Sequence, residues 1–304
     1  MTRLFFLAAA VVALAACQTG PAARRYDPDR LPNDRLAAMV ERPIAQIEHG
    51  DLSGGLATFE AMAAAARTRG GAHSLREADL LTAFGSQLHN QTVSSGDPGY
   101  SERALSYLQR ATEAYRALFG PDHPEVATAL NSWADVERYL RPHAPAAAEA
   151  ALEEAWRIRR AALGPSHKET LWTGIYLAST RSRLAWTRGE PARIERISAD
   201  LIEIVALSRA SDAATAREMP VVAQLRRVDL YARHRRWASA LAAFAAARAD
   251  AVRAGDDEAC ALVQNGGPGL ETELAGAGLA SKLADLHRAI EADIVRCAAL
   301  AGAD

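Results

Sequence analysis

The chain has 304 residues, of which 49% are hydrophobic and 24% charged, so it can bury a core in one large domain or two smaller ones. Such a composition excludes a wholly disordered protein. Alanine is abundant and aromatic residues make up only 6%, which favours helices over strands. The formal net charge of -2 gives no electrostatic footprint for nucleic acid. We therefore expect an all-α protein that does not bind nucleic acid.

Residues 1–16 have the pattern of a signal peptide. Arg3 supplies a positive charge, and residues 4–16 carry no polar side chain. This stretch is shorter than the roughly 20 residues that a membrane-spanning helix needs, and it fits the apolar region of a signal peptide. Leu14-Ala15-Ala16-Cys17 closes the stretch and resembles the lipobox of bacterial lipoproteins. The alternative is an ordinary signal peptide followed by a buried cysteine.

The lipobox resemblance implies a lipid anchor on Cys17, because in that family the thiol receives a diacylglyceryl group and the peptide is cut just before it. Residues 17–33 are rich in Pro, Arg and Asp and predict a flexible tether behind this anchor. Gln18 stands where an Asp signals inner-membrane retention in many enterobacterial relatives. We therefore expect a lipid-anchored protein of the bacterial cell envelope, at the outer membrane and facing the periplasm.

Two turn motifs recur with a period of 44 residues: 120–125 reads Gly-Pro-Asp-His-Pro-Glu and 164–169 reads Gly-Pro-Ser-His-Lys-Glu. In each motif the glycine predicts a left-handed helix cap and the proline blocks continuation of the helix. Asp122 and Ser166 are then the expected N-caps, each with a glutamate three residues later that completes a capping box. Ser74 and Glu77 repeat this box one unit earlier.

Apolar residues recur at helical spacing between these turns and predict five helix pairs in a repeat domain over residues 34–253. The predicted pairs are 34–48 with 52–68, 74–93 with 100–118, 123–140 with 145–163, 167–187 with 190–208, and 214–234 with 237–253.

The repeated segments resemble tetratricopeptide repeats of the kinesin-light-chain type, carried here by Ala162-Leu163-Gly164, Pro121-Asp122-His123-Pro124 and Leu130-Asn131-Ser132-Trp133-Ala134. The resemblance implies a right-handed superhelical solenoid of about five helix pairs, whose first helices line a concave groove. Such grooves bind an extended peptide or a partner helix, so the resemblance implies a protein or peptide partner.

Polar residues on the first helices of two successive pairs are the candidates for that groove, although an ordinary solvated face explains them as well. They are Asn131, Asp135 and Arg138, then Tyr176, Ser179 and Arg183. The tryptophans offer either an aromatic binding surface or packing between helices, and helical spacing favours packing. These are Trp133, Trp156, Trp172 and Trp186.

No catalytic constellation, cofactor motif or metal-ligand spacing stands out in the sequence, so we do not expect an enzyme. His123 and His167 share one repeat position and are better explained as structural turn residues than as metal ligands. Gly266-Gly267-Pro268-Gly269 imitates a phosphate-binding loop but lacks the strand from which such loops start. We therefore interpret this glycine-rich stretch as a linker.

Residues 254–304 are expected to form a helical cap, with a short helix over 256–264, the linker over 265–278 and a last helix over 281–300. Cys260 and Cys297 are an even pair in an oxidising compartment, which favours a disulfide. In a simple helical hairpin, however, Cys260 would lie opposite the start of the last helix. Both possibilities stay open.

The sequence therefore favours a membrane-anchored scaffold that binds a protein or peptide. Two alternatives remain: a structural subunit of a larger envelope assembly for outer-membrane protein assembly or secretion, and an accessory domain for cell-wall enzymes.

Overall fold

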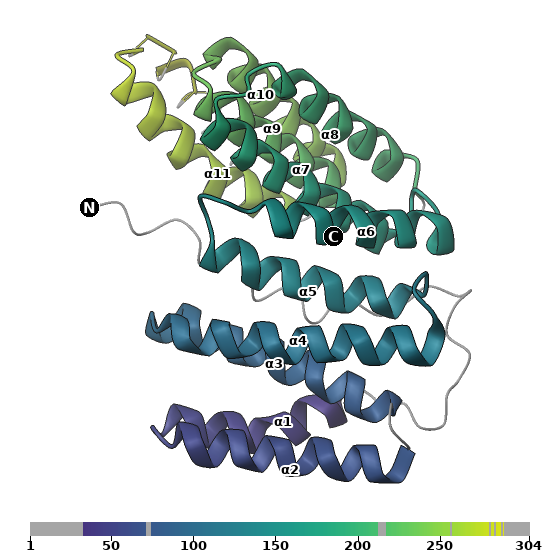
Figure 1. Cartoon of the computed structure of the whole chain (residues 1–304). Coiled ribbons are helices and arrows are strands. Elements are labelled where there is room, and N and C mark those ends of the chain that lie inside the picture. The colour runs from purple at the N-terminus through teal and green to yellow at the C-terminus, as the bar shows by residue number, and fades with distance from the viewer. Residues whose placement is uncertain are drawn as a thin grey trace. The chain divides into compact units, whose positions relative to one another are not determined.

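A computed structural model describes residues 33–70, 74–211, 217–255 and 257–279, together with residues 281, 282, 284–286 and 288. The regular elements of these residues are all helices (Figure 1), which confirms the all-α prediction. They are α1 (Asn33–Glu48), α2 (Leu52–Gly70), α3 (Leu75–Ser95), α4 (Pro98–Phe119), α5 (Pro124–Leu140), α6 (Ala146–Leu163), α7 (Lys168–Arg188), α8 (Arg193–Arg209), α9 (Met219–Arg233), α10 (Trp237–Ala254) and α11 (Asp257–Gly276).

The described chain divides into two compact units, which meet in sequence between Gly164 and Pro165. In the N-terminal unit, α1 to α6, each helix packs against the next one along the chain, and the first helices α1, α3 and α5 also contact one another in turn. The C-terminal unit repeats this arrangement with α7, α9 and α11 as the first helices and with α8 and α10 between them. Both units are stacked arrays of helix pairs, as the sequence predicted.

Three aromatic rings form the centre of the N-terminal core. Phe59 and Phe84 stack with ring centroids 3.8 Å apart, and Tyr107 meets both of them edge-on at 5.2 and 5.3 Å. These rings come from α2, α3 and α4 and bind three helices into one core. Gly85 brings α3 close to α4, because a Cβ atom at this position would lie 2.8 Å from Cγ of Leu108.

Aliphatic side chains dominate the core of the C-terminal unit, together with one central phenylalanine. Leu171 and Ile175 of α7 and Phe244 of α10 are almost completely buried in one cluster that extends through all its helices. Burial of such side chains contributes about 1.5–3 kcal/mol each, which is the main stabilising force in both units.

The predicted bounds of the five helix pairs lie within about five residues of the observed ones, but the predicted caps were partly wrong. Ser74 accepts a hydrogen bond from the backbone N–H of Glu77 at 3.0 Å, as predicted. Asp122 and Ser166 are not the N-caps. His123 and His167 cap α5 and α7 instead, each through Nδ1, which accepts from the N–H two residues later at 3.3 Å. The imidazole nitrogen thus supplies the acceptor that the sequence assigned to the preceding residue.

Gly120 and Gly164 have positive φ as expected, but not the left-handed helical conformation. Their φ,ψ values are 86°,166° and 94°,160°, a region that is accessible almost only to glycine. The chain therefore leaves α4 and α6 in an extended direction, and this requirement for glycine is stricter than at an ordinary cap.

The predicted linker over residues 265–278 is wrong, because α11 continues through the glycine-rich stretch to Gly276. Val263, Leu270 and Leu274 are buried in the core cluster of the C-terminal unit at spacings of seven and four residues. Packing of this helical face outweighs the low helix propensity of the glycines between them.

No helix of the described residues is long and apolar enough to cross a membrane. Cys17 and the residues of the predicted signal peptide and tether up to residue 32 lie outside the described residues, as do residues 289–304 with Cys297.

Candidate functional site

The three groove candidates of α5 lie along one face of this helix. Asn131, Asp135 and Arg138 are spaced four and three residues apart, so they follow one another on successive turns. Asp135 is exposed, while Asn131 and Arg138 are half-buried. The guanidinium of Arg138 donates to the carboxylate of Asp135 at 2.6 Å. An ion pair between neighbouring turns on the outer side of a helix contributes only about 0.3–0.5 kcal/mol, so contacts with a ligand can replace it.

His89 of α3 lies beside this face, a contact that the sequence did not predict. Its ring meets the ring of Tyr139 edge-on at 5.1 Å, and the charges of Asp135 and Arg138 are close enough to act on its pKa. Burial, the largest cause, lowers the pKa of His89, while Asp135 raises it and Arg138 lowers it. His89 is therefore favoured in its neutral form.

Hydroxyl groups fix the orientation of the His89 ring. Nδ1 of His89 is hydrogen-bonded to the buried hydroxyl of Ser101 at 2.8 Å, and Ser101 is hydrogen-bonded to the hydroxyl of Thr92 at 2.8 Å. We call His89, Asp135, Arg138 and Tyr139 the α3–α5 cluster.

The α3–α5 cluster combines an imidazole, a carboxylate, a guanidinium and an exposed aromatic ring. A Tyr ring and an Arg fork are the groups that most often contribute to protein interfaces. Sequence reasoning found Asp135 and Arg138 from their spacing but missed His89 and Tyr139. Tyr139 could have been found from its spacing, because it lies four residues, or one helical turn, after Asp135. His89 comes from another repeat, and only the packing of α3 against α5 places it beside these residues.

The candidates of α7 form a second face, in the C-terminal unit. Tyr176, Ser179 and Arg183 are half-buried on successive turns and continue the line of Trp172, whose ring stacks on Tyr176 at 5.9 Å. The Ser179 hydroxyl donates to the carbonyl of Ile175 at 2.8 Å, so it is partly satisfied within the helix. This face presents an aromatic pair and a guanidinium.

The tryptophans divide between packing and exposure. Trp172 packs against the core of the C-terminal unit, as predicted. Trp133 and Trp156 are half-buried, and the guanidinium of Arg160 lies 4.8 Å from the ring of Trp156. Trp186 departs from the predicted packing role, because 49% of its surface is exposed.

The α5 and α7 candidates belong to different units. Within each helix their spacing places them on one face. A continuous surface that joins Asn131 and Arg138 to Tyr176 and Arg183 stays a prediction.

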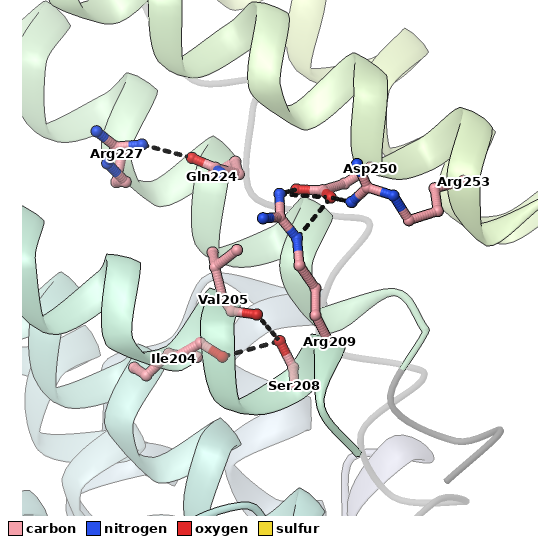
Figure 2. Close-up of polar contacts among 8 residues, drawn as sticks. All are labelled: Ile204, Val205, Ser208, Arg209, Gln224, Arg227, Asp250 and Arg253. Atoms are coloured by element: carbon pink, nitrogen blue, oxygen red, sulfur yellow. Dashed lines mark hydrogen bonds and ion pairs between the residues drawn. The ribbon is translucent and has the colours of Figure 1, made fainter. Parts of the chain in front are cut away.

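Charged side chains on the second helices are used differently, because they pair from one helix to another. Arg110 of α4 binds Glu60 of α2 at 2.7 Å, and Arg116 of α4 binds Glu154 of α6 at 2.8 Å. In the C-terminal unit, Arg209 of α8 holds the buried carboxylate of Asp250 in α10 through bonds of 2.7 and 2.8 Å, as Figure 2 shows. Such pairs connect neighbouring repeats and are structural.

Within the described ranges no group of three or more His, Cys, Asp or Glu residues could hold a metal ion. Cys260 is buried and disulfide-bonded. Its predicted partner Cys297 lies outside the described residues, so the pairing of these two cysteines stays a prediction.

Residues 99–125 and 144–169 match the family model of the tetratricopeptide repeat. These two segments have the pattern of tetratricopeptide repeats, and the array of stacked helix pairs is TPR-like. The first match covers α4 and the turn into α5, and the second covers α6 and the turn into α7.

Similar solved structures support the same fold. Two structures of the nearly identical TPR-like repeats of a Podosopora anserina kinesin light chain, the second a variant of the first, each have a TM-score of 0.50 and 16% sequence identity. They cover 73% and 74% of this chain, and 97% and 98% of their own chains are covered. No curated protein matches the chain. The comparisons identify a repeat scaffold and no catalytic domain.

Proposed function

We propose that this protein is a lipoprotein of the bacterial envelope, anchored through Cys17, and that it binds a protein or peptide through the first helices of its repeats. Tetratricopeptide repeats generally serve as protein-binding scaffolds, so the fold supports the general function. The lipobox resemblance of Leu14-Ala15-Ala16-Cys17 supports the anchor, and Gln18 supports the outer membrane.

The α3–α5 cluster is the observation that carries the binding function. Its ion pair joins two turns of α5, its imidazole is bonded to a buried hydroxyl, and its Tyr ring is 45% exposed. Asp135 and Tyr139 are exposed, so they can contact a partner. A guanidinium such as that of Arg138 can pair with a carboxylate of a bound peptide through two parallel hydrogen bonds.

A subunit buried along its whole length would need a large continuous apolar surface. The exposed large apolar side chains of the described residues come from five different helices: Val93, Phe119, Tyr139, Trp186 and Ile202. This distribution favours the scaffold over that alternative.

The anchor is tested by replacing Cys17 with Ser and fractionating the cells. The variant should leave the membranes and appear in the soluble envelope fraction, because the lipid that holds it is absent. Sedimentation with membranes after a salt wash would contradict the lipoprotein proposal.

Binding is tested by capturing partners from detergent-solubilised membranes with three chains: the native one, the double variant Asn131→Ala with Arg138→Ala, and Arg183→Ala. Each substitution should change the free energy of unfolding by no more than about 0.5 kcal/mol. Loss of a charge-assisted contact costs about 1.5–3 kcal/mol, so affinity for the captured partner should fall about tenfold or more.

The matched control is Arg157→Ala, which removes an exposed ion pair between α6 and Asp122 in the turn before α5. It should bind like the native chain. Unchanged binding in folded first-helix variants would place the functional surface elsewhere.

A further inference from the structure

The turn between α9 and α10 contains an arginine in a conformation that favours glycine. The N–H of Arg236 donates to the carbonyl of Tyr231 and the N–H of Arg235 to that of Ala232, both at 2.9 Å. These two bonds define a Schellman turn, in which the residue after the cap must be left-handed. Arg235 has a φ of 56° and is the one described residue other than glycine with positive φ.

The chain itself shows which residue this turn normally takes. Three other first helices, α1, α7 and α11, end with the same pair of hydrogen bonds. Their left-handed positions are Gly50, Gly189 and Gly278. A side chain at such a position is strained, because its Cβ approaches the neighbouring carbonyl. The side chain of Arg235 therefore introduces backbone strain, which the glycines of the three equivalent turns avoid.

Arg235 lies in a run of four basic residues, 233–236. Arg233 and Arg235 are exposed and have no ion-pair partner among the described residues, whereas Arg236 is paired with Glu195 of α8. The guanidinium groups of Arg233 and Arg236 act electrostatically on the ring of His234 between them, so positive charge gathers on this turn.

Two other arginines of this unit share one carboxylate. Figure 2 shows Arg209 and Arg253 both directed at Asp250, at 2.7 and 2.5 Å. Positive charge near the C-terminus of a helix interacts favourably with the helix dipole, which accounts for Arg233. It does not account for a charged side chain at the left-handed position of Arg235, where the equivalent turns use glycine.

A buried polar atom without a hydrogen bond is a second unfavourable feature of this turn. Nε2 of His234 is shielded from solvent and has no hydrogen-bond partner within the described part of the chain. Strain and unsatisfied polar atoms gather where a protein keeps residues for function and not for stability.

We propose that the α9–α10 turn binds phosphate groups through the guanidinium groups of Arg233 and Arg235. A guanidinium presents planar, parallel N–H donors that match the oxygens of a phosphate, and unpaired arginines are available for this contact. Its residues differ from those of the proposed peptide-binding faces. Its phosphate belongs either to a soluble phosphate ester or to the headgroup of an anionic lipid.

The test uses the full chain in two settings that separate these sources. In zwitterionic detergent, inorganic phosphate is titrated into the protein by calorimetry. In lipid nanodiscs, hydrogen exchange of residues 231–240 is compared between phosphatidylcholine alone and phosphatidylcholine with phosphatidylglycerol. Heat of binding with inorganic phosphate indicates the soluble source, and protection only with phosphatidylglycerol indicates the lipid; either result supports the site.

Arg235→Gly separates the ligand role from folding, because glycine relieves the strained φ. This variant should keep or raise the melting temperature and weaken phosphate binding about tenfold or more. Arg157→Gln removes an exposed guanidinium from the N-terminal unit and should bind like the native chain. Binding or protection in neither setting, or an Arg235→Gly variant that binds like the native chain, would overturn the proposal.

Discussion

The two units of this protein share one packing scheme but differ in the charge of two first helices each, α3 and α5 against α7 and α9. Helices α3 and α5 contain five acidic residues and two basic ones: Glu77, Asp79, Glu125, Asp135 and Glu137, and Arg76 and Arg138. Helices α7 and α9 contain seven basic residues and two acidic ones: Lys168, Arg181, Arg183, Arg188, Arg226, Arg227 and Arg233, and Glu169 and Asp229.

Part of this difference is structural. Glu77, Asp79 and Glu137 are buried, and their carboxylates accept hydrogen bonds from Arg67, Tyr115 and Arg141 of the same unit. Small and aliphatic residues recur on the packed sides of both units, because neighbouring helices must approach closely. The comparison teaches that the repeat fixes the apolar buried positions, whereas the charged side chains of these helices serve contacts inside each unit as well as at its surface.

The largest expected effect comes from truncating the central phenylalanine of either unit. Phe84 of the N-terminal unit and Phe244 of the C-terminal unit are both buried almost completely. Phe84→Ala and Phe244→Ala should each lower the free energy of unfolding by about 3–5 kcal/mol, because each leaves a cavity. Hydrogen exchange should show the greatest loss of protection in the unit that carries the change. An equal loss of protection in both units for each variant would contradict the division into two units with separate cores.

A smaller effect should distinguish two buried tyrosines that make matching contacts. Tyr115 donates to the carboxylate of Asp79 at 2.6 Å in the N-terminal unit, and Tyr231 donates to the hydroxyl of Ser198 at 2.9 Å in the C-terminal unit. Tyr115→Phe should cost about 1.5–3 kcal/mol because the acceptor is charged, and Tyr231→Phe about 0.5–1.5 kcal/mol.

Ser198 also accepts a bond from Arg227 at 3.0 Å, so it keeps one partner when the Tyr231 hydroxyl is removed. Urea unfolding of the two variants beside the native chain measures both costs. A larger loss for Tyr231→Phe would contradict this account of the two contacts.

The smallest expected effect is on the pH dependence of stability. Burial, the largest cause, lowers the folded-state pKa of His89 below its ordinary value of 6.5. As pH falls below 6.5, the unfolded chain binds a proton that the folded chain resists, so stability is lost on acidification. His89→Gln should flatten this dependence in the N-terminal unit, measured as the difference in melting temperature between pH 8 and pH 5. A variant with the same pH dependence as the native chain would contradict the buried neutral His89.

Helix pairing was predictable from sequence because the turn motifs and the apolar period are local signals. The pair at 120–125 and 164–169 located four helix ends with few residues of error. The N-caps were wrong because the neighbouring residues Asp122 and His123, or Ser166 and His167, all carry acceptors, and only the backbone direction after the positive-φ glycine selects the histidine.

Longer-range features were beyond the sequence. The course of α11 depends on three buried side chains that pack on other helices, which no local propensity of Gly266 or Pro268 reveals. The position of His89 beside Tyr139 depends on how α3 packs against α5, two helices from different repeats. Half of the candidate cluster was therefore visible in the sequence, and the other half required the structure.

The central claim, that partners bind the first helices, is tested most directly by photo-cross-linking in intact cells. A photoreactive phenylalanine replaces Tyr139 of α5, Trp186 of α7 or Ile202 of the second helix α8, three positions with similar exposure of 45%, 49% and 48%. We expect cross-links to a partner from position 139, position 186 or both, and none from position 202. Cross-links from position 202 alone would contradict the claim.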